Sequence, residues 1–145
     1  MEVFKEFKFD AAHRLPSAPE GHKCRQLHGH TYRVVIHVEG EVDEERGWIV
    51  DFADIKAAMK PLLAQLDHHY LNEIEGLDKP TAESLADWFW RHLITPLPGL
   101  CKVVVCENES CGCIHTGPKP DRTHRTTLVE SKQERQPIAR QMSMA

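Results

Sequence analysis

The sequence has no apolar run long enough to cross a membrane, and Met1 to Lys5 lack the apolar core of a signal peptide. It also has no basic arm and no aromatic-basic repeat, and its net charge is -4. Because nucleic-acid binding depends on concentrated positive charge, these features argue against a generic nucleic-acid-binding protein. We therefore expect a cytoplasmic protein that binds no membrane and no nucleic acid.

Cysteine is present five times, but not in the pattern of a disulfide framework or a zinc finger. An odd number without a secretory signal fits a reducing compartment. The segment 111–113 (Cys-Gly-Cys) lacks the two intervening residues of common zinc-binding pairs, so we interpret it as a glycine turn. Cys24 differs from the others, because its neighbours Lys23 and Arg25 favour a reactive thiolate.

Two histidines, His28 and His30, are spaced two apart at the start of a predicted strand that runs to about Glu39. Side chains of a strand alternate between faces, so both imidazoles point the same way and can bind one cation. His13 ends an earlier strand-like segment and offers a third imidazole. Three imidazoles with an open position suit catalytic zinc. Two alternatives remain: a closed structural site with Cys24 as fourth ligand, or His28 and His30 as two separately hydrogen-bonded core histidines.

The remaining segments predict one α+β domain, for which 145 residues are sufficient. Apolar spacing predicts a helix over 52–66 that begins at the cap Asp51 and is kinked or broken at Pro61. A second helix follows the cap Thr81. A strand is expected over 100–107, and with a further strand ending near His115 the order is strand, strand, helix, helix, strand, strand.

Two further polar groups adjoin apolar segments. Asp67 and His68 follow the first predicted helix, where the aspartate can orient the imidazole for proton transfer near neutral pH. An ordinary helix end with a solvated histidine explains this pair as well. Glu107 shares strand parity with Val103 and Val105, so its carboxylate is expected to point inward. Such a carboxylate needs a strong donor, either a structural ion-pair partner or a ligand.

Six motifs resemble, in order, those of the 6-pyruvoyltetrahydropterin synthase and 6-carboxytetrahydropterin synthase family. The resemblance covers residues 1 to about 117 and is closest to the bacterial 6-carboxytetrahydropterin synthases of queuosine (7-deazapurine) biosynthesis. Each motif alone is modest, but the set is specific. The motifs are Phe9-Asp10-Ala11-Ala12-His13-Arg14-Leu15, Cys24-x-x-x-His28-Gly29-His30, Gly47-Trp48-Ile49-Val50-Asp51-Phe52, Leu66-Asp67-His68-His69-Tyr70-Leu71-Asn72, Pro80-Thr81-Ala82-Glu83 and Val105-Cys106-Glu107.

The resemblance implies the tunnelling fold, an antiparallel four-stranded sheet with two helices on one face. It also implies that subunits join their sheets into a barrel, commonly as a homohexamer built from two trimers, with active sites at subunit contacts. Residues 1–117 then form the pterin synthase-like domain. Residues 118–145 lie outside the resemblance, and their polar composition predicts a flexible C-terminal tail.

The resemblance also implies a reaction. The substrate is 7,8-dihydroneopterin triphosphate, and a zinc-dependent carbon-carbon lyase converts it to 6-carboxytetrahydropterin, acetaldehyde and triphosphate. The implied roles are zinc binding by His13, His28 and His30, proton abstraction by Cys24, a second proton transfer by Asp67 and His68, and pterin anchoring by Glu107. Local candidates for triphosphate contacts are Arg14, Lys23 and Arg25, each of which is equally explained as solvated surface charge.

Two alternatives remain. One is 6-pyruvoyltetrahydropterin synthase activity, which eliminates triphosphate and retains the side chain. The other is a non-catalytic, zinc-stabilised binding protein, although a structural zinc would explain none of Asp67, His68 and Glu107. The chain also departs from related sequences at Asn108, where threonine is usual, and at His115, where tyrosine is usual.

Overall fold

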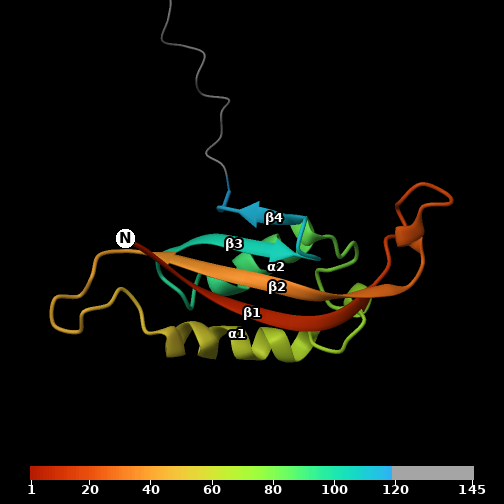
Figure 1. The fold of residues 1–145 in the computed structure, drawn as a ribbon. Helices are drawn as coiled ribbons and strands as arrows, with labels where there is room; N and C mark the ends of the chain where they lie inside the picture. The colour runs from red at the N-terminus through yellow and green to blue at the C-terminus, as the bar shows by residue number, and fades with distance from the viewer. Residues whose placement is uncertain (119–145) are drawn as a thin grey trace, which may run out of the picture.

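The structure is a computed structural model that describes residues 1–118. Four strands form one antiparallel sheet in the order β1-β2-β3-β4 (Figure 1). The predicted tail over 118–145 therefore lies, apart from its first residue, outside the described residues. The strands are β1 (Glu2–His13), β2 (His28–Glu39), β3 (Leu100–Cys106) and β4 (Gly112–His115).

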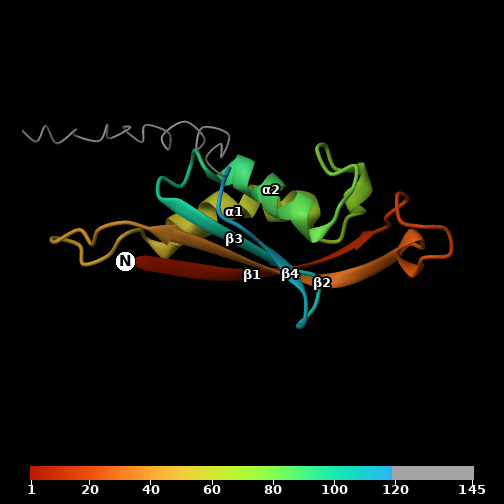
Figure 2. The same ribbon diagram turned by 90° about the horizontal axis from the view of Figure 1, so that it is seen from above.

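Two α-helices, α1 (Phe52–Leu66) and α2 (Ala82–Leu93), lie on the same face of the sheet (Figure 2). They are inserted between β2 and β3, so the predicted α+β arrangement is confirmed. Helix α1 continues across Pro61 without a break. Within residues 1–118, no helix is both long enough and apolar enough to cross a membrane.

Side-chain caps begin both helices where the sequence predicted them. Asp51 Oδ1 accepts a hydrogen bond from Ala53 N at 2.8 Å, and Thr81 Oγ1 accepts one from Ser84 N at 3.2 Å. Each cap satisfies a backbone donor that the first helical turn leaves free. The caps therefore fix where α1 and α2 begin, and Thr81 also sets the position of Pro80 next to the strand ends.

The core lies between the inner face of the sheet and the two helices. Alternate residues of β1 and β2 point into it, including Phe9 and Tyr32, whose rings stack with centroids 5.0 Å apart. On the helix side, Phe89 of α2 packs against Phe9. This alternation continues to the strand ends, so the inner-face histidines are extensions of the core.

The β1-β2 register decides which residues meet at that end. His13 pairs with His28 and Ala11 with His30 along a ladder that begins at Glu2 and Glu39. A register slip of one residue would turn every β2 side chain to the other face. The long apolar ladder therefore places the histidines side by side.

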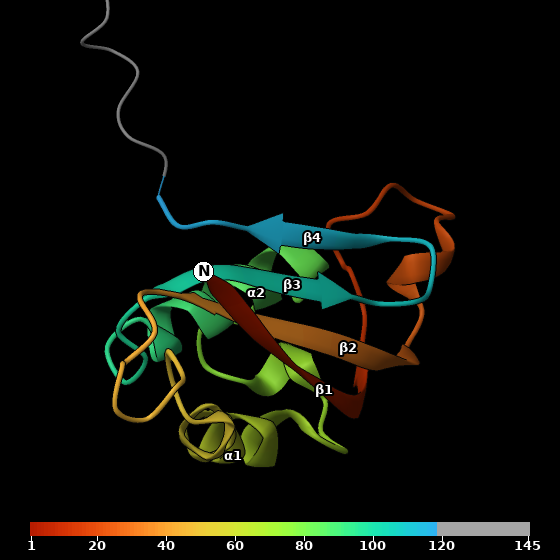
Figure 3. The same ribbon diagram turned by 60° about the vertical axis from the view of Figure 1, so that its left-hand side comes forward.

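The sheet has two edges, β1 and β4, which lie on opposite sides in Figure 3. The segment after α1 covers part of the β1 edge. His68 N donates to Asp10 O at 2.6 Å, and Ala12 N donates to His69 O at 3.1 Å. The same segment forms a parallel bridge between Ala12 and Tyr70. These bonds fix the residues that follow α1 against the sheet.

Gly112 does not form the predicted turn. It begins β4 and pairs with Cys106, after a loop over 107–111. A Cβ atom at this position would lie 2.5 Å from Val105 O, so the glycine permits close approach of the two strands.

Candidate metal centre and active site

The structure brings the three predicted zinc ligands together. His13 Nε2 lies 3.0 Å from His28 Nε2, and one ring nitrogen from each of His13, His28 and His30 lies within 4.8 Å of the others. Two nitrogen ligands of a tetrahedral zinc are about 3.3 Å apart, given zinc–nitrogen bonds of 2.0–2.1 Å. The spacing of the histidines therefore fits a metal centre.

Main-chain carbonyls determine which ring nitrogens face the centre. His13 Nδ1 lies 2.7 Å from Pro80 O, and His28 Nδ1 lies 2.8 Å from Gln26 O. A carbonyl only accepts, so both Nδ1 atoms carry hydrogen in the neutral rings and both Nε2 lone pairs point toward each other. A shared cation removes the repulsion between them. Separately hydrogen-bonded core histidines do not explain this arrangement.

The protonation of His13 also suits metal binding. This residue is 1% exposed, and burial lowers the pKa of its imidazole, opposed by the hydrogen bond to Pro80 O. The neighbouring His28 lowers the pKa of His13 further. A zinc ligand must be the neutral imidazole, so burial favours the form that binds.

Cys24 lies beside the histidines but outside their cluster. Among residues 1–118, the group whose ligand atoms lie within 4.8 Å contains the three histidines and not this thiol. Cys24 instead lines a hollow of about 330 Å³ together with the histidines, Leu15, Lys23, Glu107 and Asn108. The arrangement favours an open metal site with a neighbouring thiol over a closed site.

A short 3₁₀ turn, Lys23–Arg25, holds Cys24 in this place. Cys24 N donates to His22 Nδ1 at 3.1 Å, and Cys24 O accepts from Leu15 N at 2.7 Å. Both backbone groups of the residue are thus bonded to the loop around it. Its thiol is thereby positioned at the hollow.

Glu107 follows the end of β3 and is half-buried. It lines the metal-site hollow and also an adjoining hollow of about 320 Å³, whose other residues include Thr81 and Glu83 at the start of α2. Among residues 1–118, no ion pair involves Glu107. The described residues therefore do not support a structural ion pair and leave the carboxylate facing the hollows.

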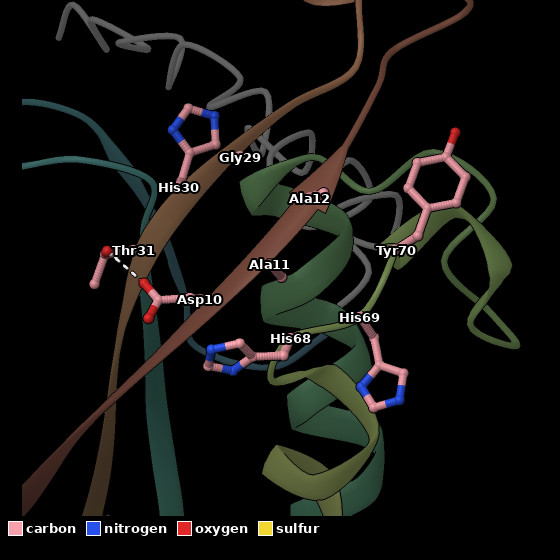
Figure 4. Close-up of a pocket in the computed structure, with 9 residues that line it drawn as sticks. All are labelled: Asp10, Ala11, Ala12, Gly29, His30, Thr31, His68, His69 and Tyr70. Carbon is pink, nitrogen blue, oxygen red and sulfur yellow. Dashed lines mark hydrogen bonds between the residues drawn. The ribbon is translucent and has the colours of Figure 1, made fainter.

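His68 lies in another place, where it lines a hollow of about 590 Å³ at the β1 edge (Figure 4), and Asp67 directly precedes it in the chain. His68 Nδ1 lies 3.0 Å from Asp67 Oδ1, and Asp10 N donates to the same oxygen at 3.0 Å. The Asp10 N–H and then His68 lower the pKa of the Asp67 carboxyl. The pair is thus built for an ionised aspartate that orients an imidazole.

The two hollows have different linings. Cys24 and Glu107 line the first but not the second, and His68 lines the second but not the first. His30 is common to both. One chain therefore does not gather all the predicted site residues around a single cavity.

The basic candidates for phosphate contacts also separate. Lys23 lines the metal-site hollow, whereas Arg25 Nη1 donates to Ala18 O at 2.7 Å and so stabilises its own loop. The backbone of Arg14 is held by Asn72, whose side chain bonds both its N and its O. Of the three, only Lys23 lies at the hollow.

The departures at Asn108 and His115 have visible structural consequences. Asn108 Oδ1 accepts from Ser110 N at 2.8 Å and organises the loop before β4. The His115 ring packs edge-on against Trp90, and its Nε2 lies 3.6 Å from Asp87 Oδ1. Asn108 therefore shapes the rim of the hollow, while His115 joins β4 to α2.

Sequence patterns did not identify two residues beside the metal site. Tyr32 Oη lies 3.2 Å from His13 Nδ1 and is fully buried, and its strand parity with His28 and His30 was the available signal. The Pro80 carbonyl gave no signal, because a main-chain acceptor has no residue-type signature. Both lie behind the metal-binding face of His13.

Comparisons with known proteins agree with this geometry. The family model described as 6-pyruvoyl tetrahydropterin synthase matches residues 2–118. A 6-carboxy-5,6,7,8-tetrahydropterin synthase of Synechocystis sp. is 40% identical over 123 residues, covering 81% of this chain and 94% of the relative. The human 6-pyruvoyl tetrahydrobiopterin synthase is 32% identical over 136 residues, covering 80% and 91%.

A solved structure shows the same fold. The Caenorhabditis elegans 6-pyruvoyl tetrahydropterin synthase superposes with a TM-score of 0.75 at 26% identity. The match covers 81% of this chain and 96% of the other. The described sheet and helices thus correspond to nearly the whole of that protein.

Proposed function

The chain belongs to the 6-pyruvoyl tetrahydropterin synthase family and is a pterin synthase, and we propose that it makes 6-carboxytetrahydropterin. The proposed substrate is 7,8-dihydroneopterin triphosphate, and the other products are acetaldehyde and triphosphate. The three side-chain carbons divide between the carboxyl group and the two-carbon aldehyde, and one water is taken up. The product would enter queuosine biosynthesis.

The observation that carries this proposal is the hollow that combines three imidazoles of one cluster, a positioned thiol and a carboxylate without an ion-pair partner among residues 1–118. His13, His28 and His30 would hold zinc, with the first two using Nε2. When bound, zinc acts as a Lewis acid that polarises oxygen atoms of the substrate. The donor set of three neutral imidazoles fits this cofactor.

Cys24 and Glu107 would act on the substrate from the same hollow. The thiolate of Cys24 accepts a proton from a side-chain carbon next to an oxygen-bearing carbon. The carboxylate of Glu107 accepts hydrogen bonds from the ring N–H and exocyclic amine of the pterin. The distance between ring and side chain then sets which proton reaches the thiol.

Asp67 and His68 would supply the second proton transfer. Asp67 orients the imidazole, and His68 carries the proton. Because His68 and Cys24 line separate hollows within one chain, the proposed active site forms at subunit contacts. A barrel that joins β1 and β4 edges of neighbouring chains, in a homohexamer, would also cover the open sheet edges.

Mass spectrometry of the products tests the proposal. Incubation of the zinc-loaded enzyme with 7,8-dihydroneopterin triphosphate should yield 6-carboxytetrahydropterin together with acetaldehyde. A product that retains all three side-chain carbons would instead identify 6-pyruvoyltetrahydropterin synthase activity, the second candidate, which the similarity to the human relative supports. Unchanged substrate with bound zinc would favour the zinc-stabilised binding protein and contradict both.

A further inference from the structure

The outer face of the sheet carries a hydrogen-bonded pair beside the hollow of His68. Asp10 of β1 and Thr31 of β2 are cross-strand partners, and both are exposed. Thr31 Oγ1 donates to Asp10 Oδ1 at 2.5 Å (Figure 4). A short hydrogen bond to an ionised oxygen is strong, so the hydroxyl fixes a carboxylate that would otherwise rotate freely in water.

The backbone of Asp10 places that carboxylate next to the proposed proton-transfer pair. Asp10 N donates to Asp67 Oδ1 at 3.0 Å, and Asp10 O accepts from His68 N at 2.6 Å. One carboxylate oxygen each from Asp10 and Asp67 and one ring nitrogen of His68 lie within 4.8 Å of one another. The imidazole of His68 therefore lies beside two carboxylates from different segments.

His68 requires such neighbours because little else holds its ring. Its side chain is 76% exposed, and its only described side-chain partner is Asp67, through Nδ1 at 3.0 Å. Its backbone has a φ of 59°, a left-handed conformation that a residue with a side chain seldom adopts. The ring therefore stays exposed at the β1 edge, with the two carboxylates beside it.

We propose that Asp10, held by Thr31, is a positioning residue for His68. The inference rests on the proposed role of His68 in proton transfer. Asp67 bonds one ring nitrogen, and Asp10 confines the ring from the side of the sheet. Asp10 therefore acts on turnover through the imidazole, without contacting the reacting atoms.

The test compares Asp10→Asn and Thr31→Val with the zinc-loaded wild-type enzyme. Asn keeps the shape of the side chain without its charge, and Val keeps the β-branched shape without the hydroxyl. We expect each to lower kcat about three- to tenfold, with KM within about twofold, because the loss is one orienting interaction. Thr31→Ser restores the donor and should recover most of the loss caused by Thr31→Val.

Glu6→Gln is the matched control. Glu6 also lies on the outer face of β1 and also has a β2 partner, Arg33, at 3.1 Å. It is four residues from Asp10, or about 13 Å along the strand. We expect its kcat to equal that of the wild type. An equal loss in Glu6→Gln and Asp10→Asn would show a general effect of the outer face and overturn the inference.

A double-mutant cycle separates positioning from a structural role. If Asp10 acts through His68, then Asp10→Asn should have no further effect on the residual kcat of His68→Ala. An undiminished loss in that background would overturn the inference, as would wild-type kcat in both Asp10→Asn and Thr31→Val. A second zinc per chain that Asp10→Asn removes would also overturn it, because the carboxylates would then bind a cation.

A different outcome would contradict the proposed role of His68. Wild-type turnover in His68→Ala would contradict the proposed function of that residue itself. An inactive His68→Ala together with active Asp10→Asn and Thr31→Val would contradict only the role of Asp10. The single variants therefore distinguish the two failures.

Discussion

The metal-site hollow and the hollow of His68 differ in how their histidines are held. His13 is 1% exposed and its Nδ1 is bonded to a main-chain carbonyl, so strand register and core packing fix the ring. His68 has a side chain that is 76% exposed and depends on carboxylates at a sheet edge. One chain therefore brings the three proposed metal ligands together by itself, whereas the side chain of His68 is presented outward.

The largest expected effect of a substitution is on zinc binding in the metal-site hollow. His28→Ala removes one of three imidazoles, and we expect zinc affinity to fall by more than the 10- to 100-fold typical of lost outer-shell contacts. Metal content after dialysis against a chelator measures this. His92→Ala is the control, because His92 lies on α2 and bonds Trp88 O. Full zinc retention in single alanine variants of all three ligands would contradict the assignment.

Cys24→Ala should separate chemistry from metal binding in the same hollow. The thiol lies outside the histidine cluster, so zinc content and oligomeric state should not change. We expect kcat to fall by roughly 10²- to 10⁴-fold, the scale of lost acid-base catalysis. Loss of zinc in this variant would instead support the closed site, and wild-type turnover would reject the thiol mechanism.

His68→Ala tests the role of the hollow of His68. We expect kcat to fall by roughly 10²-fold or more with zinc content intact, because in the proposed mechanism the imidazole transfers a proton and does not bind metal. A change confined to KM would argue against that role. A fall in kcat with intact zinc would show that residues of both hollows take part in one reaction, although they line separate hollows in one chain.

Mixed oligomers test whether Cys24 and His68 of one active site come from different chains. By the proposed mechanism, Cys24→Ala and His68→Ala subunits each have a strongly reduced kcat when assembled alone. If each active site takes the two groups from different chains, unfolding and reassembly of a mixture should restore activity at the sites where both are intact. If one chain supplies both groups, the mixture should stay as inactive as its components.

The sequence predicted the metal-site hollow better than the hollow of His68. The parity of His28 and His30 follows from strand periodicity alone, and the register with His13 follows from a long apolar ladder. The location of His68 could not be derived, because it depends on hydrogen bonds between the segment after α1 and the β1 edge. The proposed role of Asp10 could not be predicted for the same reason, since it depends on the contact between the segment after α1 and the β1 edge.

The carboxylate of Glu107 gives a smaller expected effect. Glu107→Gln preserves size but replaces one acceptor with a donor, which leaves a mismatched group against the pterin ring. The mismatch should weaken binding by about 1 to 3 kcal/mol, or roughly five- to 150-fold. Calorimetric titration with an unreactive pterin measures it, and zinc content should not change. Equal affinities in variant and wild type would remove Glu107 from the binding site.

Deletion of residues 119–145 should have little effect on the described domain, since the family match ends at residue 118. We expect unchanged zinc content and kcat within about twofold, as for removal of a polar terminus. Size-exclusion chromatography of the truncated protein is the informative measurement. Dissociation of the oligomer would show that the tail holds subunits together.

The smallest expected effect is on the pH dependence of stability that comes from Asp67 and His68. The Asp10 N–H and His68 lower the pKa of Asp67 in the folded protein, so the ionised carboxylate stabilises the fold. This contribution is present above the unfolded pKa of roughly 4 and is lost as the pH falls through the lower folded value. Asp67→Asn lacks the titration, so its Tm deficit relative to the wild type should shrink between pH 6 and pH 3.

Thermal unfolding of both proteins across that range measures the difference directly. Any effect of low pH that the two proteins share cancels in the comparison. Asp78→Asn, which removes an exposed carboxylate elsewhere, controls for the change in net charge. A deficit that stays constant or grows as the pH falls would mean that Asp67 is not held ionised by Asp10 and His68. The proposed orientation of the imidazole would then lose its electrostatic basis.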